Sequence, residues 1–111
     1  MLEYNASFGP DESITIPLDA NLDNAPKGYH GASLSALANL ANKKEYRLVA
    51  CDFGGSNAFF LRHDVAVHIP EVDVSNAYMQ SVSRKDPFGQ QLREGDVLGR
   101  IEELGLPLVQ V

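Results

Sequence analysis

The polar pair Glu3 and Asn5 is the first place where this sequence offers side chains suited to chemistry. Both follow an apolar start at Leu2 and read as the closing end of a buried strand. Side chains two apart on a strand point to the same face, and ligands of open α/β sheets bind beyond the carboxyl ends of strands. We therefore expect Glu3 and Asn5 to face a substrate cleft. The alternative is that Asn5 hydrogen-bonds the turn at residues 9–10 and that Glu3 is solvated.

Tyr29 and His30 form a second candidate site, directly before the most regular helical pattern in the chain. A helix N-terminus favours anions, and a histidine can act as acid or base near neutral pH. His30 and Glu3 are thus the candidate catalytic bases, with Tyr29 as a substrate-binding candidate. The alternative has Tyr29 packed as a hydrophobic staple and His30 exposed. Asn57, after a glycine-rich turn, is a further substrate-binding candidate or a turn hydrogen-bonder.

Several function classes lack their usual signals in these 111 residues. There is no G-x-G-x-x-G loop, no GKS or GKT loop and no H-E-x-x-H motif, so we expect no nucleotide or metal site within the chain. A formal net charge of −6 argues against nucleic acid as the main partner. The lone Cys51 reads as a buried, inert thiol. No apolar run approaches the ~20 residues of a membrane span, and we expect a cytoplasmic protein.

Hydrophobic periodicity places these residues on a short series of elements. Leu34, Leu37, Ala38 and Ala41 predict a helix capped by Ser33 or Gly31. Strands follow at residues 46–51, buried on both faces, and 57–62, paired as an antiparallel hairpin. The remaining predictions are a brief strand at 13–16, a surface loop at 19–28, a strand or extended edge at 65–69, a short helix from Ser75, a turn at 86–89 and a helical stripe through Val97, Leu98, Ile101 and Leu104.

The segments EYNASFGP, GYHGASLSALANLANKKEYRLVACD and NAFFLR together resemble the C-terminal part of an FkbM-type, S-adenosylmethionine-dependent methyltransferase-like protein. The resemblance covers roughly residues 2–64. It implies an α/β fold class, namely the C-terminal portion of a Rossmann-like methyltransferase sheet: a strand, a helix and an antiparallel hairpin whose final strand inserts into the sheet. Residues 1–64 would then be this half-domain, and residues 65–111 a partly helical wrapping tail. Relatives tend to have glycine where this chain has Glu45.

In that family the cofactor is held by earlier strands, so the resemblance carries over no cofactor-binding residue. It puts Glu3 and Asn5 on the acceptor side of the cleft. We therefore predict an incomplete methyltransferase-like domain that is inactive alone, with S-adenosylmethionine implied only for a full-length relative. The alternative is a small standalone α+β protein-interaction module. An unpaired first strand invites association, so a homodimer through the exposed sheet edge is also predicted.

Overall fold

Three strands and a helix form the larger part of the fold in the computed structural model, which describes residues 1–80 and 94–111. Strand β4 (Asn57–Arg62) lies between β1 (Leu2–Glu3) and β3 (Tyr46–Cys51) and is antiparallel to both. The two outer strands are therefore parallel to each other. The predicted hairpin is confirmed, and so is the insertion of its second strand beside the first strand of the chain.

Helix α1 (Leu34–Lys43) covers one face of this sheet. Ser33 caps it, as predicted, by accepting a hydrogen bond from the Ala36 amide at 3.2 Å. The helical stripe places Leu34 against Tyr4, Leu48 and Ala58, which are all buried. Burial of this apolar surface is the main force that fixes the helix on the sheet.

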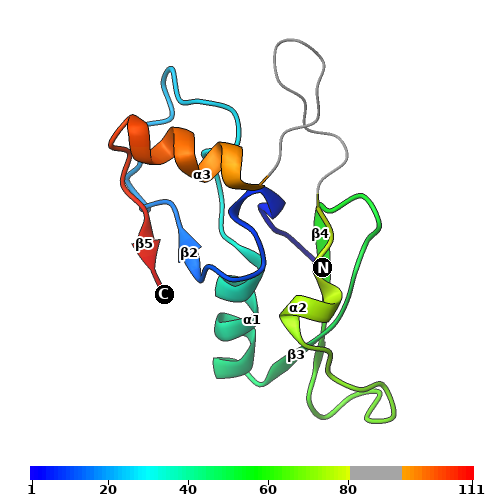
Figure 1. Cartoon of the computed structure of the whole chain (residues 1–111). Helices are drawn as coiled ribbons and strands as arrows, with labels where there is room; N and C mark the ends of the chain where they lie inside the picture. The colour runs from blue at the N-terminus through cyan, green and yellow to red at the C-terminus, as the bar shows by residue number, and fades with distance from the viewer. Residues whose placement is uncertain (81–93) are drawn as a thin grey trace.

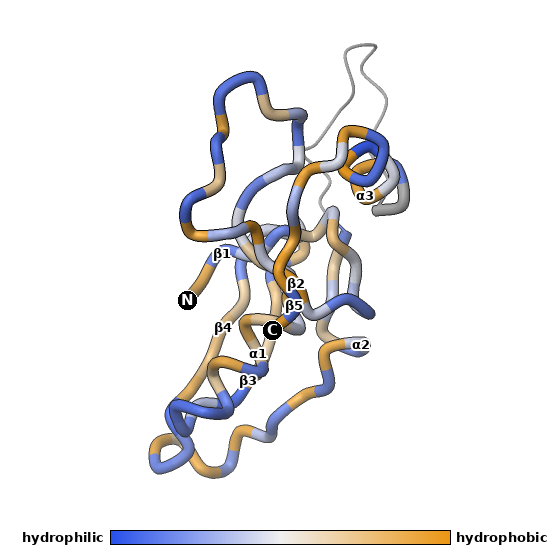
Figure 2. The backbone as a smooth tube through the Cα atoms, turned by 90° about the vertical axis from the view of Figure 1, so that its left-hand side faces the viewer, coloured by the Kyte–Doolittle hydropathy of each residue, from blue (hydrophilic) through white to orange (hydrophobic). Residues whose placement is uncertain are grey.

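A second, smaller sheet joins distant parts of the chain. Strand β2 (Ile14–Thr15) pairs antiparallel with β5 (Val109–Gln110). Helix α3 (Glu94–Glu103) packs over the 3-10 helix η1 (Ala6–Phe8), and Val97 and Ile101 enter a second apolar cluster. Both views place α3 toward one end of the molecule, and the start of β3 and the end of β4 toward the other (Figures 1 and 2).

The described residues thus form an α+β fold with small antiparallel sheets and three α-helices. The predicted strand at 13–16, the loop at 19–28 and the stripe from Val97 are confirmed. The turn predicted at 86–89 lies outside the described residues. The tail packs on both apolar clusters through α2 (Val74–Ala77) and α3, while the proposed boundary at residue 64 stays a prediction.

Three predictions about burial and local structure were wrong. Strand β3 is not buried on both faces, because it is an outer strand and leaves Tyr46 and Ala50 exposed. In β1, Leu2 and Glu3 are exposed for the same reason. The short helix α2 begins after Asp73 instead of Ser75.

Residues 65–69 form turns instead of the predicted strand or extended edge. Three carbonyl groups of this segment accept hydrogen bonds from the buried guanidinium of Arg47. The guanidinium donates hydrogen bonds to four backbone carbonyl oxygens, those of Arg62 at 2.7 Å, Val65 at 3.1 Å, Ala66 at 2.8 Å and Ile69 at 3.0 Å. Carbonyls gathered around one cation are not available for a strand ladder, which explains the difference.

Candidate functional site

The predicted site residues gather around the carboxyl end of β1. The strand ends at Glu3, and Asn5 instead caps η1 with its side chain. Beyond the strand the Tyr4 amide donates to the Ser56 carbonyl at 2.9 Å, and the Asn5 amide donates to the Ala32 carbonyl at 2.8 Å. This short segment therefore joins the turn of the hairpin to the loop that precedes α1.

Asn5 is the most fully engaged of the predicted residues and is only 1% exposed. Its Nδ2 donates to the carbonyls of Gly28 at 2.6 Å and His30 at 2.8 Å. Its Oδ1 accepts from the Ser7 amide at 3.0 Å. These bonds fix the loop before α1. The alternative interpretation expected Asn5 to hydrogen-bond the turn at residues 9–10, whereas its Nδ2 bonds this loop.

Glu3 and Asn57 are brought together across the ladder, where they are directly paired. Directly opposed side chains share a face and have Cβ atoms about 4.5–5.5 Å apart. Glu3 is exposed. The Asn57 Nδ2 donates to Asp52 Oδ2 at 2.8 Å, so this side chain also organises the turn between β3 and β4.

The Asp52 carboxylate is the centre of that turn. Its Oδ1 accepts hydrogen bonds from the backbone amides of Ser56 at 3.0 Å and Asn57 at 3.2 Å. Hydrogen bonding, first from the Ser56 amide and then from Asn57, lowers the pKa of this carboxyl below its ordinary value. Asp52 is therefore an ionised turn residue near neutral pH, a role that the sequence interpretation did not assign to it.

Tyr29 and His30 differ in their surroundings although they are adjacent. Tyr29 is 3% exposed, packs in the second apolar cluster and donates its hydroxyl hydrogen to the Pro107 carbonyl at 2.7 Å. That placement agrees with the packing alternative for Tyr29. His30 is half-buried, and its main-chain oxygen accepts from Asn5. Of this pair, only the imidazole remains a candidate acid or base.

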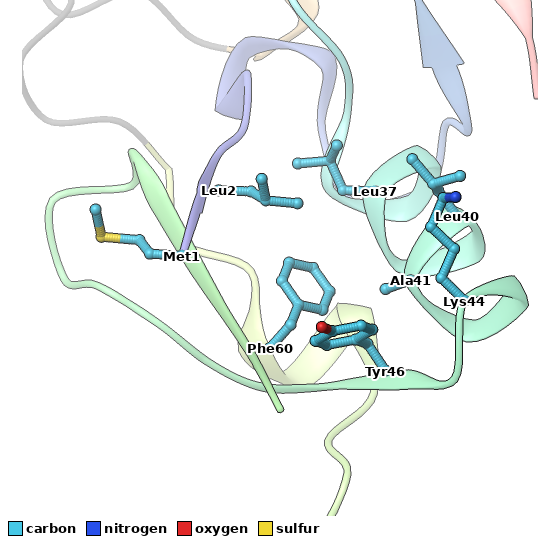
Figure 3. Close-up of a pocket in the computed structure, with 8 residues that line it drawn as sticks. All are labelled: Met1, Leu2, Leu37, Leu40, Ala41, Lys44, Tyr46 and Phe60. Carbon is cyan, nitrogen blue, oxygen red and sulfur yellow. The ribbon is translucent and has the colours of Figure 1, made fainter. Parts of the chain in front are cut away.

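An apolar groove lies on the α1 side of β1, and sequence reasoning did not find it. Its volume is about 260 Å³. Figure 3 shows α1 on one side of it and the strands on the other, with the lining residues Met1, Leu2, Leu37, Leu40, Ala41, Lys44, Tyr46 and Phe60. One signal was present in the sequence: Leu40 widens the helical stripe beyond the face that α1 buries, and it is 48% exposed.

Cys51 and Tyr4 lie together in the first cluster and are poorly suited to ionise. Burial raises the pKa of the Cys51 thiol, with a smaller opposing effect from its hydrogen bond with Tyr4. Burial likewise raises the pKa of the Tyr4 hydroxyl, which donates to the Met79 carbonyl at 2.7 Å. A thiol that stays protonated is a weak nucleophile, which supports the interpretation of Cys51 as inert, although the residue is half-buried and not buried as predicted.

Comparison with protein-family models, curated proteins and solved structures finds no match for this chain. The resemblance to FkbM-type methyltransferases therefore stays a prediction. Within residues 1–80 and 94–111, no three His, Cys, Asp or Glu side chains converge in a way that could hold a metal ion. No helix in the described part of the chain has the length and apolarity that a membrane crossing needs.

Proposed function

We propose that this chain contributes the acceptor-substrate side of an S-adenosylmethionine-dependent methyltransferase-like domain. The strand arrangement is the observation that carries the proposal. A helix connects β1 to β3, which are parallel, and β4 lies between them in the opposite direction. This is the order that the sequence resemblance implies for the end of a Rossmann-like methyltransferase sheet.

The position of the polar residues supports the same proposal. The carboxyl ends of the parallel strands β1 and β3 meet at one edge of the sheet, near the start of α1. Glu3, Asn57 and His30 lie around that edge, where open α/β sheets bind ligands. Asn5 and Asp52 hold the two loops that form it.

The methyl transfer that we assign to this edge needs few catalytic groups. Transfer of a methyl group from a sulfonium to an oxygen or nitrogen acceptor depends mainly on holding the two reactants in line. A base is required only where the acceptor must lose a proton. Glu3, which is exposed, and His30, which is half-buried, are the side chains that we assign to this step.

Calorimetry with S-adenosylmethionine tests the proposal. The chain alone should release no binding heat, because the donor pocket belongs to strands that this sequence does not contain. Binding should appear when the chain is mixed with a separately produced donor half of an FkbM-type methyltransferase, which carries the glycine-rich loop. Tight binding by the chain alone, or no binding by the mixture, contradicts the proposal.

The apolar groove favours a second candidate, a small α+β interaction module. Leu2 is 45% exposed and Leu40 is 48% exposed, and both line the groove. Exposed apolar surface that is gathered in one place often marks a protein-binding site. A folded chain that melts cooperatively as a monomer, without any donor half, would support this candidate over the first.

A further inference from the structure

The outer edge of β1 offers backbone groups to an added strand. Leu2 and Ala58 are directly paired, and the Tyr4 amide donates to Ser56. Backbone groups alternate in direction along an antiparallel strand. Because those of Leu2 and Tyr4 face β4, the N–H and C=O of Glu3 face away from the sheet.

The apolar groove runs beside the same edge. The Leu2 side chain points into it, opposite Leu37 of α1 and next to Phe60 of β4 (Figure 3). Glu3 projects from the other face of β1, because successive side chains alternate. An added strand would therefore place every second side chain in an apolar environment and the others near a carboxylate.

The charge distribution selects the kind of strand. An exposed Glu3 on a chain of net charge −6 attracts lysine or arginine at the positions that face it. A second copy of this chain carries the same negative charge, so repulsion disfavours the predicted homodimer at this edge relative to a basic partner. The residues that line the groove include one charged side chain, Lys44 at the end of α1, and no acidic one.

We propose that β1 accepts an extended segment of another polypeptide, one in which apolar and basic residues alternate. The apolar side chains fill the groove beside Leu2, and the basic ones lie near Glu3. The backbone of the segment pairs with the outward N–H and C=O of Glu3, which is the strand-addition mode of peptide recognition. This inference requires no methyl donor, and it is an alternative to the methyl-transfer proposal at this edge, because a larger methyltransferase-like sheet would continue from the same side of β1.

A capped, fluorescein-labelled peptide of eight alternating valines and lysines is the probe, followed by fluorescence anisotropy. The parent chain should bind it at least tenfold more tightly than a peptide of four valines followed by four lysines, which has the same composition. Binding should also slow hydrogen exchange at the Glu3 amide. Equal affinity for the two peptides would reduce the interaction to net-charge attraction and overturn the proposal.

Variants at Glu3 separate backbone pairing from charge. Glu3→Pro removes the outward N–H without removing a β1–β4 ladder bond and should weaken binding about tenfold or more. Glu3→Lys keeps the backbone donor and should weaken binding similarly by repulsion. The matched control is Glu12→Lys, which makes the same charge change at an exposed residue elsewhere and should change affinity less than threefold.

Two outcomes count directly against the proposal. The first is a weakening by Glu12→Lys equal to that by Glu3→Lys, which would make the position of the carboxylate irrelevant. The second is a dimer in sedimentation that the alternating peptide does not dissociate, which would make a second copy the occupant of the edge. Circular dichroism of the Glu3 variants checks that each one is folded.

Discussion

Replacing Asn5 tests whether its carboxamide is a structural element of the fold. Its hydrogen bonds within the described residues include those to the Ser7 amide and to the carbonyls of Gly28 and His30, and the residue is 1% exposed. Asn5→Ala leaves these buried groups without their partner. A lost hydrogen bond of this kind costs about 1 kcal/mol each, so the expected loss is about 3 kcal/mol. That is a large part of the roughly 5–15 kcal/mol typical of a domain.

Asn5→Asp is the more specific variant because it keeps the shape and removes the two donors. At neutral pH a buried carboxylate would face two carbonyl oxygens, so we expect a larger loss than for Asn5→Ala. The surroundings would raise the pKa of the new carboxyl in the folded state. Its destabilisation relative to the parent should therefore shrink as the pH falls and the group becomes protonated.

Urea unfolding followed by circular dichroism measures both variants. Asn39→Ala is the matched control, because Asn39 is exposed and, within residues 1–80 and 94–111, its side-chain amide donates a hydrogen bond to the Ser13 hydroxyl. This control should change the free energy of unfolding by less than about 0.5 kcal/mol. If Asn5→Ala costs no more than Asn39→Ala, the structural role assigned to Asn5 is wrong.

Three other perturbations have defined outcomes. Glu45 has φ of 64°, so Glu45→Gly should stabilise the chain by about 0.5–1 kcal/mol in urea unfolding, whereas Lys44→Gly, at φ of −101°, should destabilise it. Arg47→Met should lower the free energy of unfolding by about 2–4 kcal/mol, and protease should then cut the chain near residues 65–69; an unchanged cleavage pattern would contradict the view that the Arg47 hydrogen bonds hold this loop. Because burial raises the folded-state pKa of Cys51 and Tyr4, the stability that they contribute is complete below their unfolded pKa values and is lost as the pH rises above about 8.5–10. Thermal melts from pH 7 to 11 should show that loss, and Cys51→Ser should reduce it.

Local patterns in the sequence were sufficient for the helix and the hairpin. The spacing from Leu34 to Ala41 gives α1 a continuous apolar stripe, and residue type narrowed its cap to Ser33 or Gly31, of which Ser33 is the one found. Glycines between two apolar runs predict the antiparallel pairing of β3 and β4. Glu45 adopts a left-handed conformation directly after α1, a geometry that favours glycine, so its residue type alone did not predict it.

The parts that the sequence did not predict depend on partners far away along the chain. Asn5 reaches carbonyls 23 and 25 residues distant, and a single asparagine carries no mark of such partners. Arg47 lies within an apolar run, and three of its four carbonyl partners come from an irregular loop without periodicity, while the fourth ends β4. The pairing of Glu3 with Asn57 needed the strand register, which local patterns do not specify.

The pairing of β2 with β5 has a consequence for how the protein is made. Ser13 and Val111 are 98 positions apart, yet the Val111 amide donates to the Ser13 carbonyl at 2.9 Å. At typical translation speeds of 5–20 residues per second, β2 waits about 5–20 s for its partner. Phe8, Ile14 and Tyr29 await the same late segment, through Val97 and Ile101, whereas the hairpin and α1 are complete much sooner. A ribosome-bound nascent chain should therefore present these side chains to chaperones until Val97, Ile101 and β5 have emerged.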